Sequence, residues 1–274
     1  MKKILLPTDF SDVSDNAIRY AVEIAKLTGA SLTLLHVYHV PVVTTDMPVV
    51  MPTLEDLEKD CLSGLEKIKQ EILSHNSGLN VDCKCECGLV VDEMEDYLKV
   101  NSVDLIVVGT QGAGYLSEKL LGSVTTSLIK KVKVPVLIID REVRYKPIKK
   151  IALACDYKEI SNATLSSLKE FGKLFNAKIF VVNVVREEAE IIPTTDEAAV
   201  GVKIDHLLED IEHSYHYAQN DDVVEGVNDF VQEHNIDLIV MIPRQHSGFR
   251  NLFHEAETKR MAFHTHTPFL SLHE

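Results

Sequence analysis

Short runs of apolar residues alternate along the chain with longer segments in which apolar residues recur every three or four positions. The short runs predict buried β-strands, and the longer segments predict amphipathic helices. In the first half of the chain we expect strands at residues 3–8, 31–37, 79–87, 103–109 and 134–139, and helices at 13–28, 54–75, 90–100 and 123–132. Strands that alternate with helices predict an α/β fold with a parallel sheet covered on both faces.

The polarity of the predicted strands separates the edge of the sheet from its centre. The strand at 79–87 alternates polar and apolar residues, so we expect it at a sheet edge, whereas the other four are almost wholly apolar. Ser11 or Asp12 can cap the first helix, and Gly29 suits its C-terminal end. The segment 39–53, which holds three prolines, is predicted to be a long loop.

The second half of the chain repeats the first. Residues 2–10 (KKILLPTDF) match residues 149–157 (KKIALACDY), and residues 103–107 (VDLIV) match residues 236–240 (IDLIV). The segment between these two matches is shorter in the second copy. We therefore predict two tandem domains of one fold, at residues 1–143 and 147–274.

Charge and hydropathy exclude several classes of partner. The chain of 274 residues has a net charge of −14, which repels nucleic acid and anionic membranes. No apolar run is long enough to span a bilayer, and the apolar part of the N-terminus stops too soon for a signal peptide. We expect a cytoplasmic protein whose partners include neither nucleic acid nor membrane.

The five cysteines argue against a disulfide framework, because their number is odd and no signal peptide is found. Cys83, Cys85 and Cys87 alternate with charged residues, so a strand places the three thiols on one face. A metal or redox site is one interpretation. We favour the other, in which this face packs on a helix, because cysteine often behaves as a buried apolar residue and the spacing is not that of a zinc site.

The most informative segment follows the strand predicted at 103–109. It begins GTQGAG at residue 109 and continues to LLGSVT at 120–125, where a helix is predicted to start. Glycines let the backbone approach a phosphate closely, and the free N–H groups of a helix N-terminus attract an anion. This loop therefore predicts a phosphate-binding site.

The spacing of Gly109, Gly112, Gly122 and Ser123 resembles the nucleotide-binding signature of the universal stress protein family. The turn PTDFS at 7–11 and the segment LLHV at 34–37 resemble the same family. The resemblance covers the whole chain as a tandem pair. It implies two doubly wound domains of the adenine nucleotide alpha hydrolase type, each with five parallel strands in the order 3-2-1-4-5. It also implies an intramolecular pseudo-dimer joined through the last strands, around 134–139 and 268–272, and it is compatible with a homodimer of whole chains.

The resemblance further implies an ATP site at the carboxyl ends of the strands, where the general rule for open α/β sheets also places a ligand. Asp9 would hold the ribose, the backbone of Val37 would contact the adenine, and Val108 would cover the ring. Backbone N–H groups at the helix start would bind the phosphates, which carry Mg²⁺. The implied binding residues are Pro7, Thr8, Asp9, Val37, Val108, Gly109, Gly112, Gly122, Ser123, Val124 and Thr125. Asp9 can instead cap the following helix and the valines can be core residues, so the glycines and Ser123 discriminate best.

The second copy has lost this signature. At the four positions that define it, the second copy holds Ile242, Gln245, Glu255 and Ala256. A carboxylate at the helix start repels a phosphate, so we expect ATP in the first domain alone.

Histidine is concentrated in the second copy, where nine of the 12 lie after residue 200. The candidate metal ligands are His213 and His216, at helical spacing if a helix extends so far, and His264 and His266, which would share a face of a strand. A pH-sensitive anion site in the altered loop is a further interpretation. Surface histidines are the simpler one, because no full ligand set with fixed spacing is visible.

Two classes of function fit these observations. One is a nucleotide-dependent regulatory module, in which ATP stabilises one conformation or assembly. The other is an enzyme, either an ATPase or an adenylyl-transferring ligase. The chain has no GxxxxGK[ST] loop, and Pro7–Thr8–Asp9 stand where a pyrophosphate loop would lie, so we expect slow hydrolysis at most. A dinucleotide oxidoreductase fits less well because GxG follows the fourth strand, and a purely structural protein would leave the glycine loop unexplained.

Overall fold

The computed structural model describes residues 1–40, 52–110, 122–155, 160–185, 195–243, 258, 260–261 and 266–273. The first half contains β1 (Lys3–Pro7), α1 (Asp12–Thr28), β2 (Ser31–Tyr38), α2 (Leu54–His75), β3 (Val81–Cys87), α3 (Val90–Val100), β4 (Leu105–Gly109), α4 (Ser123–Lys131) and β5 (Val136–Ile139). The second half contains β6 (Lys150–Ala154), α5 (Asn162–Phe175), β7 (Lys178–Val185), α6 (Thr195–Leu207), β8 (His213–Gln219), α7 (Val223–His234), β9 (Leu238–Met241) and β10 (Phe269–Ser271).

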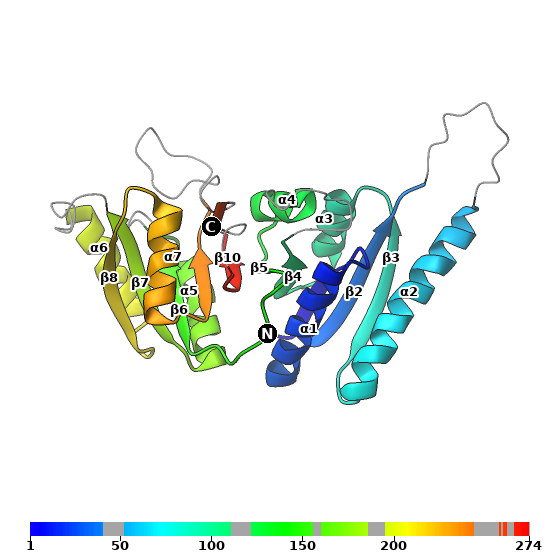
Figure 1. Cartoon of the computed structure of the whole chain (residues 1–274), viewed down its shortest axis with the longest axis horizontal. Helices are drawn as coiled ribbons and strands as arrows, with labels where there is room; N and C mark the ends of the chain where they lie inside the picture. Colours follow the sequence, from blue (N-terminus) through cyan, green and yellow to red (C-terminus); the bar gives the residue numbers. More distant parts are fainter. Residues whose placement is uncertain are drawn as a thin grey trace, which may run out of the picture.

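The strands form one sheet in the order β3-β2-β1-β4-β5-β10-β9-β6-β7-β8 (Figure 1). Each half has five parallel strands in the order 3-2-1-4-5, as expected. The halves join where β5 and β10 pair in antiparallel fashion, with Phe269 opposite Ile138 and Leu270 opposite Leu137. The expected pairing of the two last strands is therefore present.

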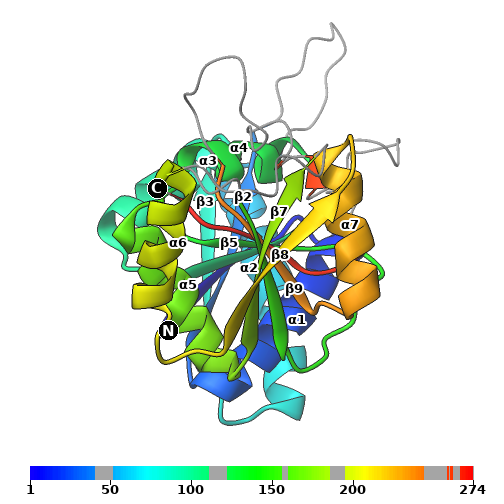
Figure 2. The ribbon, with the colours of Figure 1, turned by 90° about the vertical axis from the view of Figure 1, so that its left-hand side faces the viewer.

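Two apolar clusters, one on each face of the sheet, run through both halves. One contains Ile4 and Leu6 of β1 with buried residues of α1, α2, α5 and α6. The other contains Leu5 of β1 with residues of α3, α4 and α7. This division follows from the alternation of side chains along a strand. Figure 2, which looks along the row of strands, shows the twisted sheet with helices on both sides.

Helix α1 begins and ends at two residues for which the sequence predicts a capping role. Ser11 is the N-cap, and its side chain accepts a hydrogen bond from the backbone N–H of Ser14. Gly29 ends the helix with φ 68°, a conformation that favours glycine. Of the two candidate caps, the structure therefore selects Ser11 over Asp12.

Equivalent aspartates tie the fourth strand of each half to the first. Asp104 Oδ2 accepts the backbone N–H groups of residues 2 and 3 at 2.5 and 2.9 Å. Asp237 Oδ2 accepts those of residues 149 and 150 at 2.9 and 3.0 Å. Asp104 serves as this anchor, and β4 begins after it at Leu105, two residues later than the predicted start at residue 103.

The sequence argument against disulfides is wrong for one pair. Cys61 of α2 and Cys85 of β3 form a disulfide, while Cys83 is half-buried and Cys87 is exposed as free thiols. The three side chains therefore do not pack uniformly on a helix. The pairing depends on which helix covers β3, and a count of cysteines carries no information about that contact. The edge position of β3 is confirmed.

Candidate functional site

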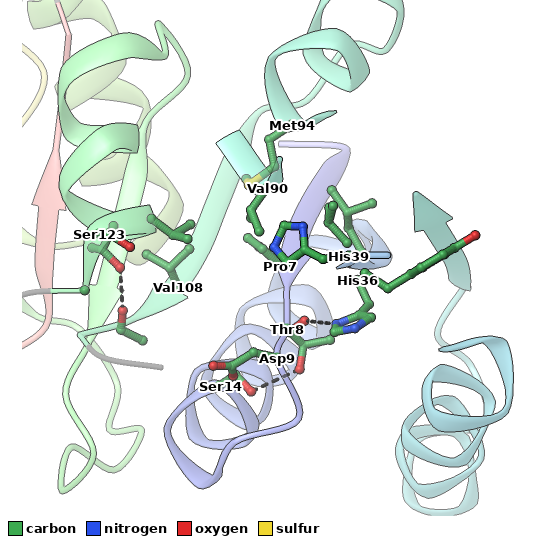
Figure 3. A pocket seen from close by; sticks show the side chains of 17 residues that line it. Pro7, Thr8, Asp9, Ser14, His36, His39, Val90, Met94, Val108 and Ser123 are labelled. Atoms are coloured by element: carbon green, nitrogen blue, oxygen red, sulfur yellow. Dashed lines mark hydrogen bonds between the residues drawn. The ribbon is translucent and has the colours of Figure 1, made fainter. Parts of the chain in front are cut away.

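A cavity of about 700 Å³ lies at the carboxyl ends of β1, β2 and β4, beside the start of α4 (Figure 3). The strand order changes direction between β1 and β4, and open α/β sheets bind ligands at such a point. The volume is within the range of sites for small molecules and cofactors. The cavity is lined by Pro7, Thr8, Asp9, Ser14, Leu35, His36, Val37, Tyr38, His39, Val90, Met94, Val108, Gly109, Gly122, Ser123, Val124 and Thr125.

The structure brings together ten of the eleven residues that the family resemblance implied. They come from three separate segments, at residues 7–9, at 37, and at 108–125. The remaining residue, Gly112, lies outside the described residues. Parallel pairing of β1 with β2 and with β4 is what places the ends of these segments side by side.

The turn after β1 is held by its own side chains. Thr8 is buried, and its Oγ1 lies 3.0 Å from Ser14 Oγ and accepts the backbone N–H of Phe10 at 3.1 Å. Asp9 Oδ1 accepts the backbone N–H and the hydroxyl of Ser11 at 3.1 and 2.6 Å. Asp9 is thus not the helix cap. It orients the capping residue, while the carboxylate remains at the edge of the cavity.

Gly109 is required for packing as well as for an open loop. A Cβ built on Gly109 would lie 2.5 Å from Val13 Cγ1 and 3.2 Å from the backbone carbon and oxygen of Val13. The first turn of α1 therefore approaches the end of β4 so closely that a Cβ at residue 109 would displace Val13. The sequence predicts a role in phosphate binding for this glycine, whereas its contact with α1 depends on the packing of the fold.

Helix α4 starts at the cavity without a side-chain cap. Its N-cap is Gly122, and the first intrahelical bond runs from Thr126 N–H to the Gly122 carbonyl. The N–H groups of residues 123–125 precede that bond, so helix geometry provides them with no acceptor inside α4. A helix start of this kind attracts an anion.

Two of the groups that we expected to meet a phosphate are already used by the protein. The N–H of Gly122 donates to the carbonyl of Thr110 at 2.8 Å. The hydroxyl of Thr125, which is buried, donates to the carbonyl of Gly109 at 2.9 Å. These bonds fix the start of α4 against the end of β4. Ser123, by contrast, is exposed at the cavity.

Sequence reasoning assigned no role to several residues of the cavity wall. The Nδ1–H of His36 donates to the carbonyl of Thr8 at 2.7 Å, which fixes the tautomer of the ring. His39 lies at the end of β2, and Val90 and Met94 extend the apolar wall from α3 (Figure 3). The LLHV segment pointed to position 36, but the hydrogen bond depends on the pairing of β1 with β2.

The histidines of the second half do not assemble a metal site in the described part of the chain. His213 and His216 lie in β8, so the assumed helical spacing is wrong, and three residues apart in a strand they face opposite sides of the sheet. His213 Nε2 lies 2.9 Å from Asp205 Oδ1. His266 precedes β10 and is not in a strand, and His264 lies outside the described residues. Across the described ranges, no group of three or more His, Cys, Asp or Glu side chains could hold a metal ion.

None of the helices that the structure describes combines the length and the apolar character of a membrane span.

Comparison with known proteins identifies relatives of this chain. The universal stress protein MJ0531 of Methanocaldococcus jannaschii is 33% identical over 147 residues, which are 51% of this chain and 82% of that protein. The universal stress protein YxiE of Bacillus subtilis is 33% identical over 146 residues, which are 50% of this chain and 97% of that protein.

A solved structure shares the fold of the whole chain. The crystal structure of a universal stress protein from Archaeoglobus fulgidus DSM 4304 matches with a TM-score of 0.75 at 18% identity, and the match covers 99% of this chain and 98% of that one. The model of the universal stress protein family matches residues 1–140, the half that contains the cavity. This chain therefore belongs to the universal stress protein family.

Proposed function

We propose that this protein binds ATP in the cavity of its first half and acts in the cytoplasm as a nucleotide-dependent regulatory module. One observation carries the proposal. The uncapped start of α4 faces a cavity of about 700 Å³ that ten of the signature residues line. Such a site offers N–H groups to phosphates at one end and an apolar wall to a base at the other.

The phosphates lie at the start of α4. The N–H groups of residues 123–125 and the exposed hydroxyl of Ser123 donate to their oxygens, and the helix dipole adds to the attraction. Gly122 and Thr125 act indirectly, because their own donors hold α4 against residues 109 and 110. This assignment refines the roles that the resemblance implies for those two residues.

The base lies against an apolar wall, and the ribose lies at the turn after β1. Val37 and Val108 are 7% and 4% exposed, so they contribute a surface that is already packed. Asp9 is the only carboxylate among the described residues that line the cavity, and it is oriented by Ser11. Its carboxylate accepts hydrogen bonds from the ribose hydroxyls.

Mg²⁺ enters this site with the nucleotide. The ion prefers oxygen ligands and keeps several waters, so phosphate oxygens with few or no protein ligands suffice to hold it. The ion therefore needs no separate site on the protein, and Asp9, the one carboxylate among the described lining residues, stays with the ribose.

We assign ATP to a domain at residues 1–143 and propose that a second domain, at 147–274, pairs with it without binding ATP. The support comes from Glu255 and Ala256, which replace Gly122 and Ser123 in the second copy. Both replacements lie outside the described residues. A carboxylate at that position opposes a phosphate.

Thermal unfolding tests the proposal. ATP with Mg²⁺ at 100 times its Kd is expected to stabilise the fold by about 2.7 kcal/mol, with AMP and GTP as comparison ligands. The variant Gly122→Glu places a carboxylate at the start of α4 and is expected to abolish the shift. Gly78→Glu is the matched control, because Gly78 is exposed with no atom within 4 Å of an added Cβ.

Two results would contradict the proposal. If no nucleotide raises the melting temperature of the wild type, the cavity is not a nucleotide site. If Gly122→Glu keeps the full shift, the nucleotide binds elsewhere.

Phosphate release separates a regulatory binder from an enzyme. We expect stabilisation by ATP with little release, because the described residues that line the cavity include no Lys or Arg to act on the transferring group. Turnover at about 1 s⁻¹ or faster, which is the range of ordinary enzymes, would favour the enzyme alternative.

A further inference from the structure

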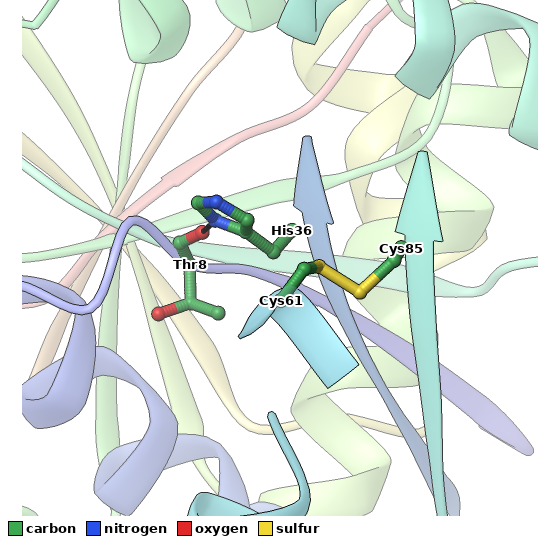
Figure 4. The surroundings of a disulfide bond; sticks show 4 residues. All are labelled: Thr8, His36, Cys61 and Cys85. Atoms are coloured by element: carbon green, nitrogen blue, oxygen red, sulfur yellow. Dashed lines mark hydrogen bonds between the residues drawn. A yellow bond between two sulfur atoms is a disulfide. The ribbon is translucent and has the colours of Figure 1, made fainter. Parts of the chain in front are cut away.

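A disulfide lies directly behind one wall of the cavity. Cys61 of α2 and Cys85 of β3 are joined across 24 positions of sequence (Figure 4). Cys85 pairs in register with His36 of the neighbouring strand β2, so the two side chains share one face of the sheet. Figure 4 shows His36 directed toward Thr8, with the disulfide on its other side.

On the Cys61 side, α2 contacts the cavity wall indirectly, through the ring of Phe10. Gly64 lies one turn after Cys61 in α2, and a Cβ at Gly64 would lie 2.9 Å from Cε1 and Cζ of the Phe10 ring. The ring of Phe10 in turn packs against that of His36, with centroids 4.4 Å apart. Phe10 has φ 62°, an unfavourable value for a large side chain, so its position depends on this packing.

On the Cys85 side, β3 contacts the cavity wall through His36 of the neighbouring strand β2. The Nδ1–H of His36 donates to the carbonyl of Thr8, and Thr8, Asp9 and His36 all line the cavity. The elements that carry Cys61 and Cys85 therefore both support the same part of the cavity wall, which consists of the turn at residues 8–11 and His36.

We propose that the Cys61–Cys85 pair is a redox-sensitive site that controls the affinity of the cavity for ATP. The inference rests on the function proposed above and names its regulation. With the disulfide formed, α2 stays fixed to β3 and keeps Phe10 seated against His36. With the disulfide reduced, α2 is held by packing alone, and the turn that carries Asp9 loses part of its support.

The chemistry requires an oxidant and a reductant. On oxidation by a peroxide, the two thiols lose two electrons and two protons as the S–S bond forms, and hydrogen peroxide becomes two molecules of water. A dithiol reverses the step, because it reduces the disulfide to two thiols and is itself oxidised to a disulfide.

The other cysteines are poorly placed for this role. Cys87 is exposed at the end of β3, and Cys155 is buried in the second half. Cys83 lies two residues from Cys85, and burial raises the pKa of its thiol, which disfavours the reactive thiolate. Cys85 is half-buried and gives an oxidant access to the pair.

Titration calorimetry with ATP and Mg²⁺, on protein treated with one equivalent of hydrogen peroxide or with dithiothreitol, tests the inference. Maleimide labelling after denaturation should count five thiols in the reduced protein and three in the oxidised protein. We expect ATP to bind at least about fivefold more weakly to the reduced protein, the lower end of ordinary allosteric coupling. Cys61→Ser and Cys85→Ser should bind like the reduced wild type in both treatments, whereas Cys87→Ser should respond like the wild type.

The outcomes separate this inference from the function on which it rests. Equal affinity in the two redox states would overturn the redox control and leave ATP binding intact. Peroxide is expected to lower the number of labelled thiols by two. Any other change in that number would also overturn the redox control. No binding of ATP in either state would overturn the proposed function, and the redox control with it.

Discussion

At the scale of single residues, one glycine satisfies two requirements. Gly109 belongs to the signature that implies phosphate binding, yet the close approach of Val13 disfavours a side chain there in any case. The backbone of α1 and the end of β4 are held together at this point. The presence of glycine at 109 is therefore weaker support for a nucleotide site than Gly122, which begins α4 without a side-chain cap.

A substitution at Gly109 should accordingly destabilise the fold even when no nucleotide is present. We expect Gly109→Ala to lower the free energy of unfolding by about 1–3 kcal/mol, as overpacking does. Urea denaturation measures it, with Gly78→Ala as the control of small effect. Val13→Ala should recover part of the loss in the double variant, because the nearest atom is Val13 Cγ1. Simple additivity of the two changes would contradict this account.

At the scale of elements, an aspartate before the fourth strand anchors each half. Asp104 and Asp237 accept equivalent pairs of backbone N–H groups, but their surroundings differ. Asp237 is buried at 9% exposure and also pairs with Lys146 Nζ at 2.9 Å, whereas Asp104 is exposed. The loss of an acceptor is more costly where water cannot replace it.

We therefore expect Asp237→Ala to be the more damaging of two equivalent substitutions. It should lower the free energy of unfolding by about 1–3 kcal/mol, and Asp104→Ala should cost less. Asp237→Asn, which keeps an acceptor, should recover part of the loss. Chemical denaturation of the three variants measures this order, and the reverse order would show that burial does not govern the anchor.

The elements themselves could be predicted because the apolar periodicity reports burial directly. Every helix and strand expected in the first half is present, and the edge position of β3 follows from its alternating polarity. The anchoring role of Asp104, the contact of Gly109 with Val13 and the disulfide could not be predicted, because each depends on which elements meet in space. The hydrogen bond of His36 could not be predicted for the same reason, because its acceptor is the carbonyl of Thr8 in the turn after β1.

At the scale of the whole molecule, the antiparallel pair of β5 and β10 makes one continuous sheet from two repeated halves. Each half thereby covers an edge strand that would otherwise offer unpaired backbone groups to other chains. His273 lies just after β10, and its carbonyl accepts the hydroxyl of Thr164 at 3.1 Å. This hydrogen bond ties α5 to the segment that follows β10, the strand through which the second half joins the first.

The pH dependence of stability should report on His273. Burial lowers the pKa of His273 to about 4, and its Nε2 has no hydrogen-bond partner among the described residues. The unfolded chain, with an ordinary pKa near 6.5, then binds more protons than the folded chain between about pH 6.5 and pH 4. Stability should therefore fall with acidification through this window, by at most about 3 kcal/mol from this group.

His273→Leu isolates that contribution. The variant removes the titrating group, so its stability should fall less than that of the wild type between pH 6.5 and pH 4. Denaturation curves at several pH values measure the difference. Parallel curves for the two proteins would show that His273 is not the source.

The central claim is that the first half alone holds a nucleotide, with its phosphates at the start of α4. A crystal structure of the full chain with a non-hydrolysable ATP analogue and Mg²⁺ tests this most directly. We predict one nucleotide per chain, with phosphate oxygens within hydrogen-bonding distance of the backbone N–H groups of residues 123–125. A nucleotide bound in the second half alone, or phosphates remote from α4, would contradict the claim.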